Sequence, residues 1–382
     1  MIKIKFENLL VSIVVSVVVF FNTISTTMLD RTFFQVKVNF LFLVVLLLGL
    51  RFLYKMRVSY KYLILSILLL LSGVLVYFQT NRLNFLVYSM LLVLLVNVDM
   101  KVVLRNYVVV AGILVVGVFL LSLVGIVPNL QYNRAGVIRN SFGFIYPTDF
   151  ASHCFYLFLA ISYLLKDKFI WTRSLFGVLL SAFIIKYCDA RLNALSILLA
   201  TVIFIYFYYS KEKKLKIFAL FPYSAVVFAS IVTYLSYKFS WSNPFLVSVN
   251  KLITGRLALG RNAFDTFGVH LFGTRNVQFI GSGGKTESVI GYNYVDSSYV
   301  QMLFTYGIVP VVLLIIIYVV ASRKQYKDGQ YLLVAILSLI AFNCMIEAFW
   351  FVPTYNIFMF LLFTTNTFSE KESNDITKLN AT

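Results

Sequence analysis

The chain has 382 residues, of which 60% are hydrophobic and 13% are charged, and its mean hydropathy is +0.88. A soluble domain of this size could not bury so many apolar side chains, whereas repeated apolar runs of about 20 residues are what a bilayer requires. The net charge of +18 would suggest nucleic acid for a soluble protein, but much of the basic excess lies in short segments between apolar runs, where it is a topology signal. The composition therefore predicts an all-α polytopic integral membrane protein without a nucleic-acid partner.

In chain order, apolar runs separated by polar breaks predict about twelve membrane-spanning helices. The first run follows Lys3 and Lys5, but no A-x-A-like cleavage site comes after it, so we interpret it as a retained helix and not as a removed signal peptide. The predicted spans are 9–28, 38–54, 60–79, 83–98, 102–127, 150–166, 170–187, 191–209, 215–236, 298–321, 330–347 and 352–368.

Lysines and arginines concentrate in every second connection between these spans, namely at 51–61, 101–105, 166–173, 211–216 and 323–327. The positive-inside rule then predicts a multi-pass protein of the plasma (inner) membrane with both termini in the cytoplasm. The sequence is accordingly divided into 1–236 (nine helices, with a medium outer loop at 128–149), 237–298 (a long extracytoplasmic loop), 299–368 (three helices) and 369–382 (a polar cytoplasmic tail).

The cysteines and histidines give no signal for a metal or a disulfide framework. Cys154, Cys188 and Cys344 lie in or beside apolar segments and show no CxxC spacing. His153 and His270 are the only histidines, which excludes a histidine-rich centre. We therefore expect neither a metal nor a cofactor.

The medium loop contains Arg134 and Arg139, five residues apart, followed by an aromatic and proline turn. This pattern fits a headgroup- or sugar-binding edge, and it equally fits interfacial anchoring by the arginines with Phe144 and Tyr146. We interpret Asp149 as the N-terminal cap of the next helix.

Arg191 begins a long apolar helix on the predicted outer side, where the topology rule does not expect a basic residue. A helix N-terminus and a guanidinium together suit an anion. Asp189, two residues earlier, could instead only neutralise Arg191 or cap the helix.

The long loop is where we expect chemistry, because a connection of about 60 residues is usually either functional or disordered and its aromatic residues argue against disorder. Arg256 and Arg261 each follow a glycine. At helical spacing they project about 140° apart, so they could hold two parts of one extended phosphate-containing anion, or they could lie on a solvated surface. His270 is either a general base or a structural residue. The GSGGK segment lacks the spacing of a phosphate-binding loop, so no nucleotide site is expected.

Asp296 lies where the chain returns to the membrane after the long loop. A carboxylate there, near arginines that hold a phosphate, could deprotonate a sugar hydroxyl. The alternative is that Asp296, Ser297 or Ser298 only caps the next helix.

Three segments together resemble a known family, the Wzy-type integral-membrane polymerases of O-antigen, capsular polysaccharide and exopolysaccharide, with the related O-antigen ligases. The segments are SFGFIYPTDFA at 141–151, DARLNALS at 189–196, and the loop pattern TGR…FGVHLFG…YVDSSYVQMLFTYGI that ends at residue 308. The ligases usually carry a histidine-asparagine pair where this chain has Asp296 and Ser297, so the resemblance favours the polymerase branch.

The resemblance implies a GT-C-like glycosyltransferase that works without a metal on the outer face of the membrane. Its donor would be a glycan on undecaprenyl diphosphate and its acceptor one lipid-linked repeat unit, with a flippase and a chain-length regulator as protein partners. By this analogy the catalytic residues are Arg191 and Arg256, which would offset charge on the leaving diphosphate, and Asp296, which would orient or deprotonate the acceptor. The implied substrate-binding residues are Arg261, Arg134, Arg139, His270 and Tyr299.

Two other functions fit the same layout. A flippase for the same lipid-linked sugar also has about twelve spans with both ends inside, but transporters usually place polar residues near the bilayer midplane, whereas the charges here gather at the predicted outer face. A ligase that transfers finished glycan shares the architecture and the arginines, and only the residues at 296 and 297 separate it from a polymerase.

Overall fold

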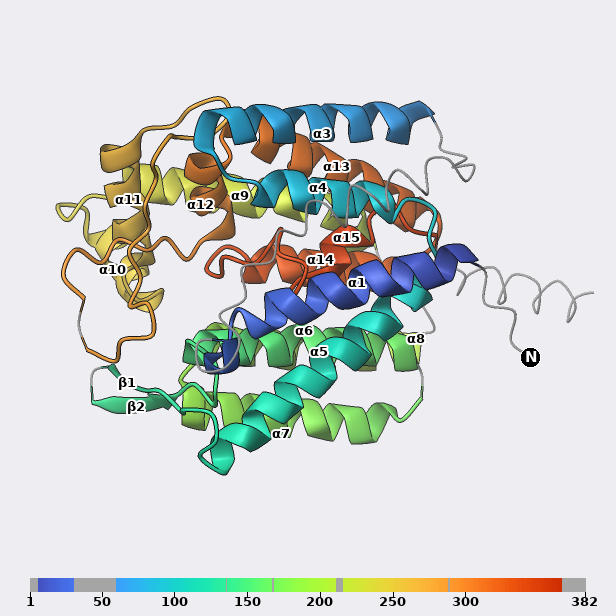
Figure 1. The fold of residues 1–382 in the computed structure, drawn as a ribbon, viewed down its shortest axis with the longest axis horizontal. Coiled ribbons are helices and arrows are strands. Elements are labelled where there is room, and N and C mark those ends of the chain that lie inside the picture. The colour runs from blue at the N-terminus through green and yellow to red at the C-terminus, as the bar shows by residue number, and fades with distance from the viewer. Residues whose placement is uncertain are drawn as a thin grey trace, which may run out of the picture.

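The computed structural model describes residues 6–30, 60–134, 136–166, 168–210, 216–287 and 289–365. Most of them form a bundle of helices with similar axis directions (Figure 1). The long helices are α1 (Phe6–Ile24), α3 (Tyr60–Thr80), α4 (Asn84–Leu94), α5 (Met100–Leu123), α6 (Pro147–Leu165), α7 (Ile170–Cys188), α8 (Arg191–Ser210), α9 (Ser224–Lys238), α13 (Ile308–Lys327) and α14 (Tyr331–Asn343). Two short 3-10 turns, η2 (Lys216–Ala219) and η3 (Phe221–Tyr223), lead into α9.

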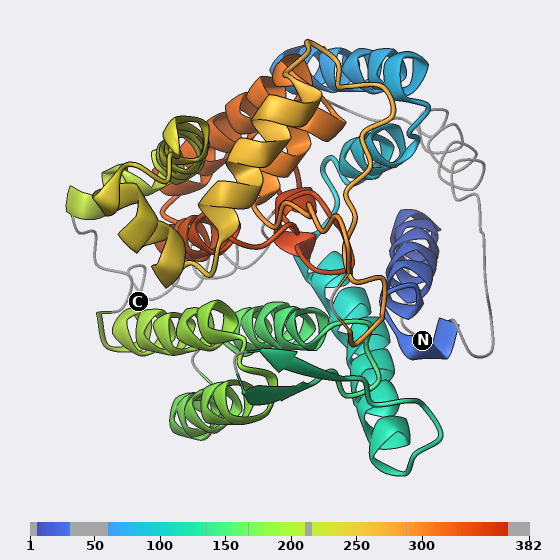
Figure 2. The same cartoon turned by 90° about the vertical axis from the view of Figure 1, so that its left-hand side faces the viewer.

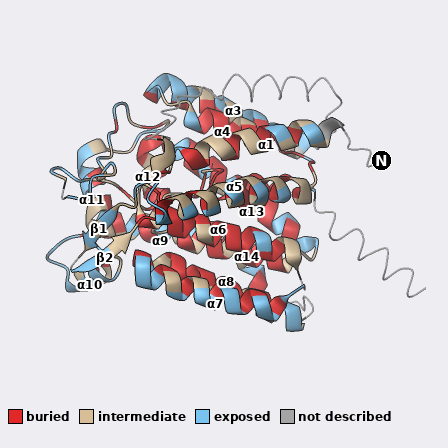
Figure 3. Cartoon of the chain, turned by 60° about the horizontal axis from the view of Figure 1, so that its bottom comes forward, coloured by how far each residue is buried: buried red, intermediate tan, exposed pale blue. Residues whose placement is uncertain are grey.

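Seven helical segments of the described ranges are long and apolar enough to cross a membrane. These segments differ in how much of each is buried inside the protein: 72% of the most apolar part of α6 is buried, against 33% for α7. Side chains such as Ile113 and Leu175 are more than half exposed, which suits contact with lipid. Figure 3 shows the buried residues on the inward faces of the helices. The arrangement is that of a polytopic membrane protein with α6 as a central helix.

The structure corrects the predicted spans in several places. The single helix predicted at 298–321 is wrong, because α12 (Ser298–Thr305) and α13 are separated at Gly307, whose φ of 93° favours glycine. The span predicted at 352–368 is wrong in its described part, where the only helix is α15 (Ile357–Phe360) and nearly every residue is buried. That apolar run fills the protein core. The helices α4 and α14, with 11 and 13 residues, are shorter than a straight span requires.

The predicted span at 38–54 lies outside the described residues, and the count of about twelve spans is not confirmed by the described ones. The other predicted spans each coincide with a helix of the bundle, and their boundaries differ by a few residues. The coincidence follows from composition, because long runs of Leu, Val, Ile and Phe without proline form helices whose backbone groups are bonded internally.

Several segments outside the long helices lie at one end of the bundle (Figure 1). They include α10 (Pro244–Leu252) and α11 (Arg256–Phe267), which run across the ends of the long helices, as Figure 2 shows. They also include the antiparallel hairpin of β1 (Gln131–Arg134) and β2 (Val137–Asn140). The start of α5, the α6–α7 connection and the end of α13 lie at the opposite end of the bundle.

The described remainder of the long loop, 268–287 and 289–297, has no regular structure, but its first part is bonded to the bundle. The backbone N–H groups of Ile308 and Val309 donate to the carbonyl oxygens of His270 and Leu271, each at 3.0 Å. Thr274 N–H donates to the carbonyl oxygen of Phe304 at 2.8 Å. These bonds fix the loop at the break between α12 and α13.

Candidate functional site

A cavity of about 290 Å³ lies at the end of the bundle that carries the hairpin. Its walls come from the hairpin, the start of α6, the start of α11 with the long loop, and the turn after α14. Charged and aromatic side chains dominate the lining, which includes Arg134, Arg139, Arg256, Asp149, Asp296, Glu347, Tyr132, Tyr146, Tyr292 and Tyr294. The cavity therefore combines three guanidinium groups with three carboxyl groups.

Arg256 is the first residue of α11 and follows Gly255, whose φ of 89° lets the chain turn into the helix. Its Nε lies 3.2 Å from Oδ2 of Asp296 and donates to the carbonyl oxygen of Ile346 at 3.1 Å. Its Nη1 donates to the carbonyl oxygen of Ile253 and to the hydroxyl of Thr254. Within the described part of the chain its Nη2 makes no hydrogen bond, so this nitrogen remains available to an anion in the cavity.

Asp296 faces Arg256 from the segment that precedes α12. Of the three residues considered as the cap of α12, Ser297 occupies the N-cap position, without a capping hydrogen bond from its side chain, and Asp296 precedes it. Burial raises the pKa of Asp296, although Arg256 and Arg139 act in the opposite direction. A carboxylate with a raised pKa that is held beside a guanidinium can accept a proton and can also orient a hydroxyl group.

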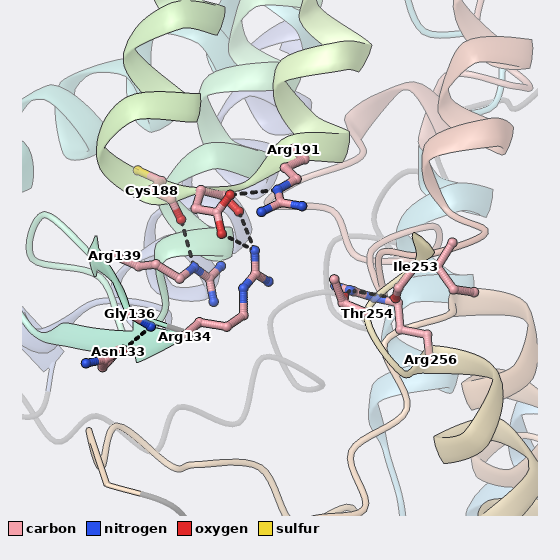
Figure 4. A network of polar contacts seen from close by, with 10 residues as sticks. Asn133, Arg134, Gly136, Arg139, Cys188, Arg191, Ile253, Thr254 and Arg256 are labelled. Atoms are coloured by element: carbon pink, nitrogen blue, oxygen red, sulfur yellow. Dashed lines mark hydrogen bonds and ion pairs between the residues drawn. The ribbon is translucent and has the colours of Figure 1, made fainter. Parts of the chain in front are cut away.

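The opposite wall of the cavity carries a cluster of arginines held by the end of α7 (Figure 4). Asp189, just after α7, accepts from Arg191 Nε at 2.8 Å and is ion-paired with Arg134, which also donates to the Asp189 carbonyl oxygen at 3.0 Å. Arg139 Nε donates to the carbonyl oxygen of Cys188 at 2.9 Å. Figure 4 shows these three arginines on one side of the site and Arg256 on the other.

The electrostatics of this cluster keep the hairpin arginines in place. Burial opposes ionisation of Asp189, but hydrogen bonds from Arg191 and Arg134 outweigh it and lower the pKa of Asp189. Burial, with the neighbouring charge of Arg134, lowers the pKa of Arg139 to about 10, which leaves this side chain cationic at neutral pH. Arg134 and Arg139 thus lie on one wall of the cavity and Arg256 on the other.

Asp149 lies in the first turn of α6 and is 8% exposed. The N-cap residue of α6 is Tyr146, so the prediction that Asp149 is the cap is wrong. The Asp149 backbone N–H donates to the carbonyl oxygen of Tyr146 at 3.1 Å. Its carboxyl group lines the cavity.

Glu347 is a cavity residue that sequence reasoning missed. It lies in the turn after α14, is 5% exposed, and accepts from Asn193 Nδ2 at 3.3 Å through Oε1. Burial raises its pKa to about 8, because a carboxylate is costly away from water. An acidic residue between apolar neighbours is the available signal, but it stands at the last position of the predicted span 330–347.

Four tyrosines contribute to the lining beside Thr148, Thr254 and Ser282, and sequence reasoning did not identify them as a group. The Tyr132 hydroxyl donates to the carbonyl oxygen of Ile145 at 2.6 Å, and the Tyr146 hydroxyl accepts from Gly283 N–H at 2.7 Å. The second bond joins the start of α6 to the irregular part of the long loop. A chain with 25 tyrosines gave no way to select these.

The structure brings Arg134, Arg139, Arg256 and Asp296 together, whereas the other predicted site residues lie elsewhere. Arg191 does not line the cavity but is joined to it through Asp189, and its side chain is 70% exposed.

Arg261 is paired with Asp265 at 2.7 Å in a different hollow. His270 is exposed on the surface. Tyr299 is 1% exposed and donates to the carbonyl oxygen of Ala341 at 2.9 Å. The cavity therefore excludes Arg261, His270 and Tyr299.

The arrangement can bind a multiply charged anion between the arginines of its two walls, beside carboxyl groups that can accept or donate a proton. In the described part of the chain no three His, Cys, Asp or Glu side chains are grouped so that they could hold a metal ion. Comparisons of the chain with family models, with curated proteins and with solved structures find no match.

Proposed function

We propose that this protein is a polysaccharide polymerase that joins oligosaccharide repeat units carried on undecaprenyl diphosphate. It transfers the growing glycan from one lipid carrier to a sugar hydroxyl of the next lipid-linked unit. The family resemblance at 141–151, 189–196 and 254–308 supports the substrate class. The geometry of the cavity supports the reaction type, because transfer from a diphosphate requires cationic groups where negative charge develops.

The observation that carries the proposal is the Arg256–Asp296 pair, which faces the arginines of the hairpin across one cavity. In the proposed reaction the diphosphate binds between Arg256 and the pair Arg134 and Arg139. The acceptor hydroxyl attacks the anomeric carbon, the bond from that carbon to the phosphate oxygen breaks, and the hydroxyl proton passes to Asp296. The arginines offset the charge that the departing diphosphate gains, so the step needs no metal ion.

The cavity volume of about 290 Å³ is at the lower limit of pockets for small ligands, which measure about 300–1,000 Å³. It suits the reacting end of the substrates, one sugar ring with its phosphates. In the proposal the rest of each glycan extends into solvent and the polyprenyl chains lie in the membrane.

The distribution of basic residues supports an extracytoplasmic location of the cavity. The segments that contain Lys101, Lys166, Lys168 and Lys327 border the end of the bundle opposite to the hairpin. The positive-inside rule assigns such an end to the cytoplasm, and the cavity then opens on the outer face. The full count of about twelve spans, both termini in the cytoplasm and a GT-C-like fold belong to the same proposal.

The proposal is tested with surface and lipid-linked glycans from cells that lack the gene and carry either the intact gene, Asp296→Ala or Arg256→Ala. The intact gene should restore a ladder of long chains, while both variants should leave single repeat units displayed outside. Arg275→Ala is the matched control, since Arg275 is an exposed arginine of the same loop and does not line the cavity. Long chains at wild-type levels with Asp296→Ala would refute the proposed role of this residue.

The same cells distinguish the two alternative functions. Repeat units that accumulate on the cytoplasmic side of the membrane when the gene is absent would indicate a flippase. Long chains that form on the lipid carrier but are not transferred to a final acceptor would indicate a ligase. Either result would refute the polymerase proposal.

A further inference from the structure

A second hollow, of about 630 Å³, lies at the end of α9 beside α11. Residues 237–241 and one face of α11 line it, and it shares no lining residue with the cavity described above. Arg261, which the sequence grouped with Arg256, lies here together with Lys238 and Asp265. The charged residues of this hollow are thus two cations and one carboxylate.

Both cations are placed against the ring of Tyr237. The Arg261 guanidinium carbon lies 5.7 Å and Lys238 Nζ 5.6 Å from the ring centroid. Arg261 is paired with Asp265, yet 39% of its side chain is exposed. Among the described residues no carboxylate lies within ion-pair distance of Lys238. The hollow is therefore open to solvent and carries a surplus of positive charge.

An apolar groove of about 410 Å³ begins at the same tyrosine, which lines both spaces. The groove runs along α9, between it and the residues of α12 and α13. Its lining is almost entirely apolar and includes Tyr234, Phe264, Leu303 and Val312. An apolar chain could lie in the groove while a charged group at its end occupies the hollow.

The two spaces lie at the depths that a membrane lipid requires. The apolar segment Lys216–Lys238, which contains α9, is long enough to span the bilayer and ends at the hollow. Trp241, in the wall of the hollow, is 71% exposed, and exposed tryptophan is typical of the headgroup layer. The hollow is then at headgroup level and the groove at the level of the acyl chains.

We infer that the hollow and the groove together bind one anionic lipid, with its phosphate at Lys238 and Arg261 and one apolar chain along α9. Guanidinium and ammonium groups bind phosphate, and basic pockets between helices at the membrane surface bind anionic headgroups. Because the hollow shares no lining residue with the cavity, the phosphate belongs to a bulk phospholipid of the membrane. Because the site is separate from the cavity, the inference does not depend on the polymerase function.

The test is native mass spectrometry of the full-length protein with phosphatidylglycerol or phosphatidylcholine at equal concentrations. The protein should retain one phosphatidylglycerol and no phosphatidylcholine. Lys238→Gln with Arg261→Gln should lower retention at least tenfold, while Lys251→Gln, an exposed lysine of α10 outside the hollow, should not. Equal retention by the double variant and the wild-type protein would overturn the inference.

Because Arg261 Nη1 also donates to the carbonyl oxygen of Tyr237, a variant that keeps both cations is needed. Asp265→Asn removes the competing carboxylate, and we expect it to raise retention of phosphatidylglycerol. Lower retention by Asp265→Asn, with thermal stability unchanged, would contradict a phosphate at Arg261.

The role of the groove is tested separately. Ser230→Trp, at an exposed position that lines the groove, should lower retention, whereas Ser248→Trp on the outer side of α10 should not. Glycerol phosphate serves as a headgroup without chains, and binding as tight as that of phosphatidylglycerol would overturn the lipid assignment. A polyprenyl phosphate is compared in the same assay, and stronger retention of it than of phosphatidylglycerol would overturn the assignment to a bulk phospholipid.

Discussion

Arg256→Ala should nearly abolish polymer formation and leave the protein folded in the membrane. The substitution removes one partner of an ion pair whose side chains are 16% and 27% exposed. Loss of one partner costs about 3–5 kcal/mol for a buried pair, and an exposed pair contributes about 0–1 kcal/mol. The Arg256–Asp296 pair lies between these limits, so we expect a stability loss of about 2 kcal/mol.

In free energy, the expected effect of Arg256→Ala on activity is larger than its effect on stability. Removing one group that stabilises developing negative charge typically lowers the rate by about 10²–10³, which corresponds to about 3–4 kcal/mol of activation free energy. Arg256→Lys keeps the positive charge but loses the fork of donors that reaches Ile346, Asp296 and Thr254. It should therefore retain intermediate activity, lower than wild type by about tenfold.

The assay is polymerisation of lipid-linked repeat units by purified protein in vesicles, with thermal unfolding measured on the same samples. In the double variant with Asp296→Asn, the carboxylate that Arg256→Ala leaves without its partner is also neutralised. Stability should then recover while activity stays lost. Activity of Arg256→Ala within threefold of wild type, or an equal loss in Arg275→Ala, would refute the assignment of Arg256 to the leaving group.

Three further predictions follow from the same structure. Burial raises the pKa of Glu347 from 4.5 to about 8, so between these pH values the folded state keeps a proton that the unfolded state loses. The stability of the protein should therefore fall as pH rises from 4.5 to 8. Thermal unfolding across this range should show a smaller fall for Glu347→Gln. Asp189→Asn weakens the ion pairs of Asp189 with Arg134, which lines the cavity, and with Arg191 beside it. Activity in vesicles should drop about tenfold, in line with about 1.4 kcal/mol; unchanged activity would show that the cluster is not needed. Gly260→Ala would place a Cβ 2.7 Å from Ser236 Oγ, so unfolding measurements should show a loss of about 1–3 kcal/mol of stability. Gly112→Ala is the control, because no atom lies within 4 Å of the added carbon, and its stability should equal that of the wild type.

The sequence predicts most of the bundle because the dominant signal, a long apolar run with polar ends, is local. Helices α3, α7 and α8 end within two residues of their predicted limits for this reason. Hydropathy cannot tell an apolar segment that faces lipid from one that fills the core, so the run that begins at Val352 was taken for a span. The chain at the Gly307 break packs closely against Leu271, 36 residues earlier. A contact between such distant residues cannot be predicted from the local sequence pattern.

The candidate site was only partly predictable for a related reason. Arg256 and Asp296 belong to one polar loop, and a charge-rich loop in an apolar chain is visible in the sequence. Glu347 and Asp149 come from other segments, and only the packing of α6, α8 and α14 brings them to the same cavity. Arg261 shares the spacing pattern of Arg256, but its helix turns it toward α9, because five residues along a helix rotate a side chain by about 140°.

The bonds between the long loop and the start of α13 make the loop a structural part of that helix. The first N–H groups of any helix lack partners within the helix. In α13 two of them, at Ile308 and Val309, are satisfied by carbonyl oxygens of residues 270 and 271. The loop thus serves as a cap supplied from a distant part of the chain. Shortening the loop through this contact would remove the partners of two backbone donors, so a bundle without the loop should begin α13 less firmly than the intact chain.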